Sequence, residues 1–172
     1  MVIWITGISG AGKTTLARHF KKKTKKNFIY FDGDEFRRIF NNDIKYTLKA
    51  RDINAERLTR LVKYLSDQKK NIIIAANLTS YKYRLWCRKN IKNFIEIFII
   101  AEISKLIKRD YKKLYSRAIN KKISNVVGID IRFKIPKGSN IYIENNRSKK
   151  DFLLKINEIT NYIKKNKIKY QN

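Results

Sequence analysis

The chain is poor in several residue types, and each shortage narrows the kinds of protein it can be. One cysteine, Cys87, rules out a disulfide within the chain and is typical of a reducing, cytoplasmic compartment. No apolar run approaches the roughly 18 residues of a membrane-spanning helix, so we expect no membrane association. No basic segment precedes the apolar run at residues 2–5, so we expect no signal peptide. The one histidine, His19, lies beyond the first turn of a predicted helix, which favours a surface or packing role over catalysis.

Acidic residues are also scarce. There are 14 Asp and Glu residues against 41 Lys and Arg residues, a formal net charge of +27. This charge suits nucleic-acid binding, attraction of small anionic substrates, or drift toward the Lys, Asn and Ile that AT-rich genomes encode. The lysines are spread over the whole chain rather than gathered in one stripe. We therefore favour drift combined with anionic substrates, and nucleic acid is the alternative partner.

Hydrophobic periodicity predicts alternating strands and helices. Strands are expected at residues 2–6, 28–31, 71–76, 94–101 and 141–143. Helices are expected at residues 13–20, 35–40, 51–67, 81–90, 104–113 and 149–164. This alternation predicts an α/β fold with a five-stranded parallel sheet flanked by helices. With 172 residues and neither an internal repeat nor a linker, the chain is predicted to form one domain, residues 1–172.

Three basic segments lack a regular apolar pattern. Residues 21–26 are predicted to form a solvated turn. Residues 114–138 contain the only proline, Pro136, and are predicted to form an irregular lid rather than part of the core. The tail at residues 165–172 is predicted to fray from the last helix.

The clearest motif is a glycine-rich loop, GISGAGKT, at residues 7–14. It matches the P-loop pattern G-x-x-x-x-G-K-[ST] between a predicted strand and a predicted helix, which argues against a chance glycine turn. In such a loop, backbone N–H groups and the N-terminal end of the helix surround phosphate. We expect Lys13 to reach the β- and γ-phosphates of ATP and the Thr14 hydroxyl to bind Mg²⁺. The residues expected to bind ATP here are Gly7, Ser9, Gly10, Ala11, Gly12, Lys13, Thr14 and Thr15.

Two carboxylates follow the second predicted strand. Asp32 and Asp34 stand at its carboxyl end, the edge where ligands bind in open α/β sheets. Either can orient Mg²⁺ or accept a proton from an attacking hydroxyl, and either can instead cap the next helix. Arg37 can face the same cleft. Arg51 and Asn54 share one face of a later helix, where a guanidinium can clamp an anionic group; the alternative is a solvated helix face.

The order of these motifs resembles that of the adenylylsulfate (APS) kinase family. Residues 4–17, WITGISGAGKTTLA, are similar to the opening of its members. Further similarities are the family's DGD-x-x-R at residues 32–37, R-x-x-N at 51–54, RDPKGLY at 109–115 and lid sequence at 128–136. A P-loop alone is unspecific, whereas the ordered set over most of the chain is a specific pattern.

The resemblance implies a kinase, commonly a homodimer, that transfers phosphate from Mg-ATP to the ribose 3′-hydroxyl of a small nucleotide acceptor. By position, the catalytic residues would be Lys13, Asp34, Asp32 and Lys112. Either aspartate would act as base or orient the metal, and Lys112 would lie on the lid near the transferring phosphate. Arg109 would lie near the ATP base, or else cap a helix end at the surface. The acceptor-binding residues would be Arg37, Tyr46, Arg51, Asn54, Val126 and Lys112.

Departures from the family pattern fall on the acceptor side. Family members sandwich the acceptor's adenine between an aromatic residue before the R-x-x-N helix and a second one in an F-T-G lid segment. Here the first position is Tyr46 and the second is Val126. Losing one stacking face removes roughly 1–3 kcal/mol, which suits a smaller base. The lid also has residues 132–134 as RFK where the family has P-Y-E, and Thr79 begins the segment matching its S-P-Y-R.

We therefore expect the acceptor to be a cytidine that carries a 5′-diphosphoramidate, as in the branch of the family that serves bacterial capsule phosphoramidate synthesis. The alternative is a true APS kinase that makes 3′-phosphoadenylylsulfate for sulfate assimilation. A nucleic-acid-binding P-loop ATPase is the remote alternative, because it leaves Arg37, Arg51 and Asn54 without a role.

Overall fold

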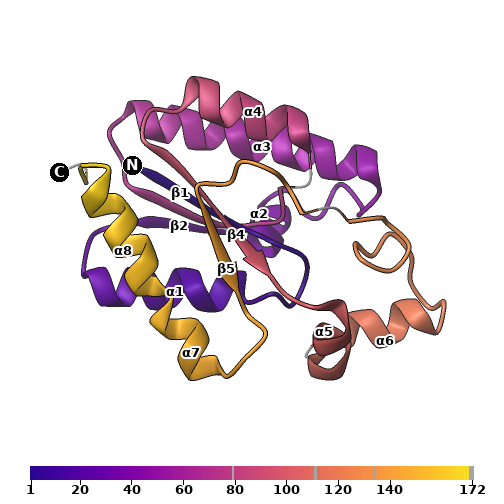
Figure 1. Ribbon diagram of the computed structural model, residues 1–172. Coiled ribbons are helices and arrows are strands. Elements are labelled where there is room, and N and C mark those ends of the chain that lie inside the picture. The colour runs from indigo at the N-terminus through magenta and orange to yellow at the C-terminus, as the bar shows by residue number, and fades with distance from the viewer. Residues whose placement is uncertain (79, 111, 134, 171–172) are drawn as a thin grey trace.

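The computed structural model describes residues 1–78, 80–110, 112–133 and 135–170, and its centre is a parallel sheet (Figure 1). In the described residues the sheet has five strands in the order β2-β3-β1-β4-β5, and every neighbouring pair is parallel. The strands are β1 (Val2–Thr6), β2 (Ile29–Asp32), β3 (Ile72–Ala75), β4 (Phe94–Ile100) and β5 (Ile141–Glu144). The predicted sheet, with its flanking helices, is confirmed.

Helices cover both faces of the sheet (Figure 1). They are α1 (Lys13–Thr24), α2 (Gly33–Ile39), α3 (Leu48–Asp67), α4 (Tyr81–Asn90), α5 (Ile103–Arg109), α6 (Leu114–Ile119), α7 (Lys149–Leu154) and α8 (Ile156–Lys165). Within the described part of the chain, none of these helices is long and apolar enough to cross a membrane.

Alternation along the strands divides the core into two clusters. In β1, Ile3 and Ile5 face the cluster formed with α1 and α8, whereas Val2 and Trp4 face the cluster formed with α3 and α4. All five residues of β1 are buried, because helices pack on both faces of this central strand. The edge strand β5 instead alternates buried and exposed residues. The two core clusters thus hold the sheet between the helices. The loops described below lie at the carboxyl edge of the sheet.

Some predicted boundaries are wrong. Helix α1 continues through three lysines to Thr24, so residues 21–24 are helical rather than a turn. The apolar pattern stops at Phe20, but lysines favour the last turn of a helix because they oppose its dipole. Helix α3 begins at Leu48, earlier than predicted, because the Thr47 side chain caps it by accepting from the Ala50 amide.

The lid is more regular than predicted. Residues 114–119 form helix α6, whose first turn is fixed by Asp110 accepting from the amides of Tyr115 and Ser116. Helix α5 accordingly ends at Arg109 and does not reach residue 113. Further along, the single closing helix that periodicity predicts is two helices, α7 and α8.

The tail is also more ordered than predicted. Tyr170 packs edge-on against Phe28 with ring centroids 6.0 Å apart, and Lys26 lies over the Tyr170 ring at 5.5 Å. Ile168 also packs against the core. Residues 168–170 are therefore docked on the domain, where periodicity alone predicts fraying.

Candidate functional site

The glycine-rich loop joins the carboxyl end of β1 to the start of α1. Gly7 and Gly12 adopt positive φ angles of 147° and 102°. A Cβ at Gly7 would lie 2.9 Å from the Ile99 carbonyl oxygen, and one at Gly12 would lie 2.8 Å from the Asn145 side-chain nitrogen. Both positions therefore need glycine. No described side chain caps the start of α1, so its first amides face the concave side of the loop, the arrangement that binds phosphate.

Lys13 is bent back over the loop. Its Nζ donates to the Ile8 carbonyl oxygen at 2.9 Å. Burial lowers the pKa of Lys13 from 10.5 to about 8, although the negative charges of Asp34 and Asp32 act in the opposite direction. A bound phosphate would add further negative charge and favour the ammonium form.

Asp32 is the most heavily hydrogen-bonded carboxylate at this edge. Its Oδ2 accepts from the Thr14 hydroxyl at 2.7 Å and from the Tyr30 hydroxyl at 3.2 Å, and its Oδ1 accepts from the Asp34 amide at 2.9 Å. Partial burial alone would raise the pKa of Asp32, but these hydrogen bonds hold it below its usual value. Burial and the charge of Asp32 raise the pKa of Tyr30 to about 12. Asp32 is thus an ionised carboxylate that both caps α2 and contacts Thr14.

Asp34 has a different environment. It is exposed, and its Oδ2 lies 2.6 Å from the Nζ of Lys112. The hydrogen bond with Asp34 raises the pKa of Lys112. This ion pair joins α2 to the segment between α5 and α6, which are distant in sequence. It places Asp34, Lys112 and Lys13 around one site, since the charges of Asp34 and Lys112 both act on Lys13.

Two arginines flank Tyr46 next to these carboxylates. The Arg37 guanidinium lies 4.6 Å from the Tyr46 ring centroid, and the Arg51 guanidinium lies 5.6 Å from it. Arg37 donates to the Lys45 carbonyl at 3.1 Å. Arg51 donates to the carbonyls of Tyr46 at 2.9 Å and of Asn125, in the lid, at 2.8 Å. Burial lowers the pKa of both arginines.

These arginines have no carboxylate partner in the described residues; each donates only to main-chain carbonyls. Asn54, one turn from Arg51 on α3, is 9% exposed, and within the described chain its side chain forms no hydrogen bond. A buried and a partly buried guanidinium without a carboxylate partner, next to a buried amide without a hydrogen bond in the described residues, are groups that an anion could satisfy. Arg51 and Asn54 are therefore not a solvated helix face.

Arg109 and Asn145 lie on the other side of the loop. Arg109 donates to the carbonyls of Asn145 at 3.3 Å and Arg147 at 3.4 Å. Asn145 in turn donates from its side chain to the Ala11 carbonyl at 2.9 Å, and the Tyr115 hydroxyl donates to the Ser9 carbonyl at 2.7 Å. The sequence around Asn145 matches no motif, so the sequence does not predict its contact with the loop, and Tyr115 is predicted only as part of the motif at residues 109–115. Thr15, beside the loop, is exposed.

Val126 lies in a tight turn of the lid. The Asp130 carboxylate accepts from the amides of both Asn125 and Val126, the latter at 2.6 Å, and Gly128 takes a φ of 97°. The Val126 side chain is 4% exposed and belongs to the core, so it offers almost no surface to a ligand in this structure. Thr79, Tyr111 and Lys134, which the sequence analysis also used, lie outside the described residues.

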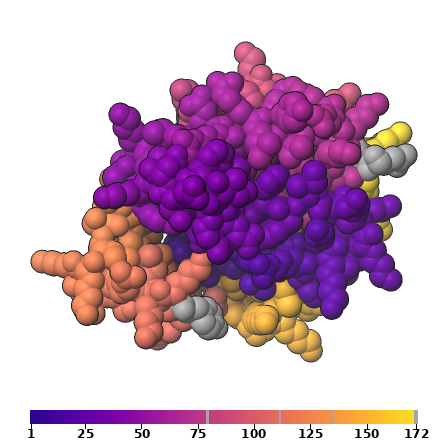
Figure 2. Space-filling model, turned by 180° about the vertical axis from the view of Figure 1, so that it is seen from behind, coloured from indigo at the N-terminus to yellow at the C-terminus, as the bar shows by residue number. Residues whose placement is uncertain are grey.

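The surface is hollowed between the lid and the segment after β2. Figure 2 shows this hollow bordered by orange and purple atoms, with indigo atoms of the N-terminal part of the chain visible inside it. A pocket of about 270 Å³ opens at the same edge of the sheet. Its lining residues are Thr6, Asn77, Leu78, Phe98, Arg132, Phe133 and Pro136.

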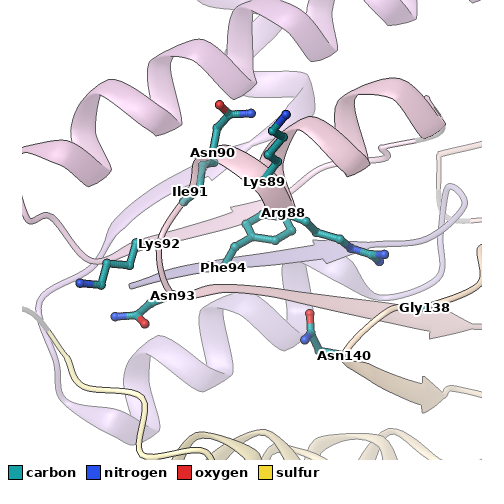
Figure 3. A pocket seen from close by; sticks show the side chains of 9 residues that line it. All are labelled: Arg88, Lys89, Asn90, Ile91, Lys92, Asn93, Phe94, Gly138 and Asn140. Atoms are coloured by element: carbon teal, nitrogen blue, oxygen red, sulfur yellow. The ribbon is translucent and has the colours of Figure 1, made fainter.

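A larger, shallow pocket of about 600 Å³ lies at the opposite, amino end of β4 (Figure 3). Lys92 and Asn93 point away from Arg88 there. The Arg88 guanidinium is already paired with the buried Glu96. Side chains that diverge, and an arginine that is already bound, do not form a convergent ligand site.

A parallel sheet, a glycine loop with Lys13 and Thr14, and carboxylates at the same edge define a P-loop phosphotransferase. The model of the adenylylsulphate kinase family matches residues 1–144, and the chain belongs to that family. It is therefore an enzyme, a kinase that transfers a phosphoryl group to a hydroxyl group.

Individual relatives support this assignment. The chain is 40% identical over 138 residues to cytidine diphosphoramidate kinase of Campylobacter jejuni subsp. jejuni serotype O:2, which covers 78% of this chain and 81% of the relative. It is 32% identical over 170 residues to adenylyl-sulfate kinase of Pseudomonas aeruginosa. This match covers 96% of this chain and 86% of the relative. The structure also superposes on the solved APS kinase of Mycobacterium tuberculosis in complex with AMPPNP and APS, with a TM-score of 0.84 and 27% identity. The superposition covers 95% of this chain and 96% of the solved chain.

Proposed function

We propose that this kinase transfers the γ-phosphoryl group of ATP to the ribose 3′-hydroxyl of cytidine diphosphoramidate, in the synthesis of a phosphoramidate-modified capsule. The observation that carries the proposal is the pair Arg37 and Arg51, two cations without carboxylate partners in the described residues, within the electrostatic reach of Asp34. Two guanidinium groups suit the two phosphoryl groups of a 5′-diphosphate-like acceptor. The name of the relative with 40% identity supports the choice of cytidine.

On the donor side, we assign the ATP phosphates to the glycine loop and the start of α1. Lys13 would turn from the Ile8 carbonyl to the β- and γ-phosphates, where its charge offsets the charge that develops during transfer. Arg109, held beside the loop by the carbonyls of Asn145 and Arg147, would border the ATP base. The full set assigned to ATP is Gly7, Ser9, Gly10, Ala11, Gly12, Lys13, Thr14, Thr15 and Arg109.

Thr14 and Asp32 fit Mg²⁺. They place a hydroxyl and an ionised carboxylate 2.7 Å apart at the mouth of the loop. Magnesium in kinases takes few protein oxygens and completes its shell with phosphate and water, so such a sparse site is sufficient. When bound, the ion supplies positive charge to the transferring phosphoryl group. Thr14 would hold the ion, and Asp32, fixed by three donors, would orient its shell.

On the acceptor side, Asp34 would receive the proton of the 3′-hydroxyl, because Asp32 is already committed to capping α2 and contacting Thr14. Lys112 would move from Asp34 to the transferring phosphate. Arg37, Arg51 and Asn54 would hold the diphosphate-like group. Further acceptor contacts would come from Tyr46 and from the backbone of the turn that contains Val126.

Steady-state kinetics with ATP test the proposal against its alternative, a true APS kinase. The family model and the Pseudomonas aeruginosa adenylyl-sulfate kinase, which matches 96% of this chain, favour that alternative. We expect kcat/KM to be at least about tenfold higher for cytidine diphosphoramidate than for APS, a difference of about 1.4 kcal/mol in transition-state binding. Phosphorus NMR of the product should show a 3′-phosphate. A higher kcat/KM for APS would replace the cytidine acceptor with APS.

We also propose that the enzyme is a cytoplasmic homodimer and that its partners are small nucleotides rather than nucleic acids. The family resemblance supports the dimer, and the buried Cys87, the one cysteine of the sequence, suits a reducing compartment. Light scattering of the purified protein tests the assembly. We expect twice the 20.5 kDa chain mass, and a mass equal to that of one chain would contradict the dimer.

A further inference from the structure

The pocket of about 270 Å³ at the carboxyl edge of the sheet is not used by any residue assigned above. Its floor includes Thr6, the residue directly before the glycine loop, and Leu78, whose amide donates to the Thr6 hydroxyl at 2.9 Å. Its outer wall is the lid segment with Arg132, Phe133 and Pro136. The pocket therefore opens next to the phosphate site and is closed by the lid.

Two polar side chains in this pocket have no partner in the described part of the chain. Within the described residues, neither the Arg132 guanidinium nor the Asn77 amide forms a hydrogen bond or an ion pair. Arg132 is exposed, whereas Asn77 is partly buried. A guanidinium offers only donors, and an amide offers both a donor and an acceptor. The pocket thus presents unused hydrogen-bonding groups of both kinds beside the phosphate loop.

The rest of the lining is largely apolar and aromatic. Phe133 stacks on Phe98 with ring centroids 5.7 Å apart and an interplanar angle of 14°. Leu78 and Pro136 complete the apolar lining. Stacked rings with a few polar groups suit a flat heterocycle better than a phosphoryl group. The volume is below the roughly 300 Å³ at which whole-ligand pockets begin, so the pocket suits one part of a nucleotide.

One of the two positions at which the family resemblance puts the base, Val126, offers no stacking face here. The Val126 side chain is 4% exposed. Tyr46 is 46% exposed, and its ring lies against both Arg37 and Arg51. The lid turn that buries Val126 continues directly into Arg132 and Phe133, and the Asn125 carbonyl ties that turn to Arg51. Phe133 is therefore an aromatic residue carried by the same lid segment.

We propose that this pocket, with Phe133, Arg132 and Asn77, binds the pyrimidine base of the acceptor nucleotide. Phe133 supplies the ring surface, Arg132 donates to the two neighbouring acceptors of cytosine, its carbonyl oxygen and ring nitrogen, and Asn77 accepts from its amino group. Adenine lacks the carbonyl oxygen, so the arrangement favours cytosine. This inference rests on the proposed nucleotide kinase activity and deepens it.

Equilibrium binding tests the pocket independently of turnover. Calorimetry with the full-length protein saturated with AMPPNP would measure the Kd of CDP, of ADP and of ribose 5-phosphate, which lacks a base. The variants are Arg132→Ala and Phe133→Leu. The matched control is Arg117→Ala, which removes an exposed lid arginine outside the pocket. Circular dichroism and thermal unfolding would establish that each variant is folded.

We expect Arg132→Ala and Phe133→Leu each to weaken CDP binding at least about tenfold, with unchanged ribose 5-phosphate binding, while Arg117→Ala binds like the wild type. Equal losses for CDP and ribose 5-phosphate would overturn base recognition and assign the pocket to the phosphoryl end. Three other results would also overturn the inference. They are unchanged CDP binding in both variants, no CDP binding by the wild type, and tighter binding of ADP than of CDP. Failure of the proposed function is a separate result, namely a preference for APS in the kinetic comparison.

Discussion

At the scale of single residues, the proposed role of Lys13 at the donor site predicts a dependence on pH. Burial lowers its pKa to about 8, against 10.5 in the unfolded chain. Because the free enzyme loses this charge above pH 8, we expect kcat/KM for ATP to fall as pH rises through 8. In Lys13→Arg the guanidinium stays charged, so any remaining activity should lack this fall. A wild-type profile that stays flat to pH 9 would contradict the assignment.

The lowered pKa of Lys13 also affects stability. Stability should rise with pH, whereas kcat/KM for ATP should fall. Between about pH 8 and 10.5 the unfolded chain holds a proton on Lys13 that the folded chain has released. The free energy of unfolding therefore gains a term that rises with pH across this window. Lys13→Met removes the titrating group, and the wild type should gain stability relative to it between these pH values in urea titrations. A constant difference between the two proteins would count against the lowered pKa.

Removing the Lys13 side chain tests its chemical role. We expect Lys13→Ala to lower kcat by at least about a thousandfold, because the ammonium group offsets charge that develops in the transition state. Lys22→Ala is a matched control, since Lys22 is an exposed lysine on the same helix. It should retain wild-type kinetics. Activity of Lys13→Ala within tenfold of the wild type would refute the role.

Arg51 tests the acceptor side. Losing its charge-assisted contacts should raise the acceptor KM by roughly 10–100-fold in Arg51→Ala, and the ATP KM should change less than about twofold. Arg38→Ala, at an exposed arginine on α2, provides the control and should change neither value. A loss confined to ATP affinity would place Arg51 on the donor side instead.

At the scale of elements, helix α4 is tied to β4 by a buried carboxylate. Glu96 is fully buried and pairs with both Arg84, which is 3% exposed, and Arg88. Glu96→Ala leaves two cations without their partner and should lower the free energy of unfolding by about 3–5 kcal/mol. Glu158→Ala, which removes an exposed pair with Lys155, should change it by less than about 1 kcal/mol. Urea unfolding measures both, and equal effects would contradict the argument.

Elements also show what the sequence could predict. The glycine loop, the sheet and the carboxylates after β2 can be predicted from local patterns. Neighbouring residues determine the backbone conformation of the loop and the burial of each strand. The Asn145 contact and the Phe133 pocket depend on contacts between distant segments, so no local pattern reveals them. The lengthened α1 was missed for a different reason: its last turn is stabilised by charge rather than by burial. Apolar periodicity detects only burial.

At the scale of the whole molecule, the net charge of +27 has to be reconciled with a site for small anions. Such a field should steer an anionic acceptor toward the enzyme, and salt should screen it, because the Debye length is about 8 Å at physiological ionic strength. We therefore expect kcat/KM for the acceptor to fall as salt is raised, while kcat stays constant.

A nucleic-acid-binding protein would instead bind single-stranded RNA, and the logarithm of its affinity would fall by about 0.7 per phosphate contact for each unit of log salt. Fluorescence anisotropy with a short RNA, run beside the kinetic titration, separates the two. Tight RNA binding whose affinity falls steeply with salt, together with a kcat/KM that does not change with salt, would show that the charge serves nucleic acid rather than the acceptor.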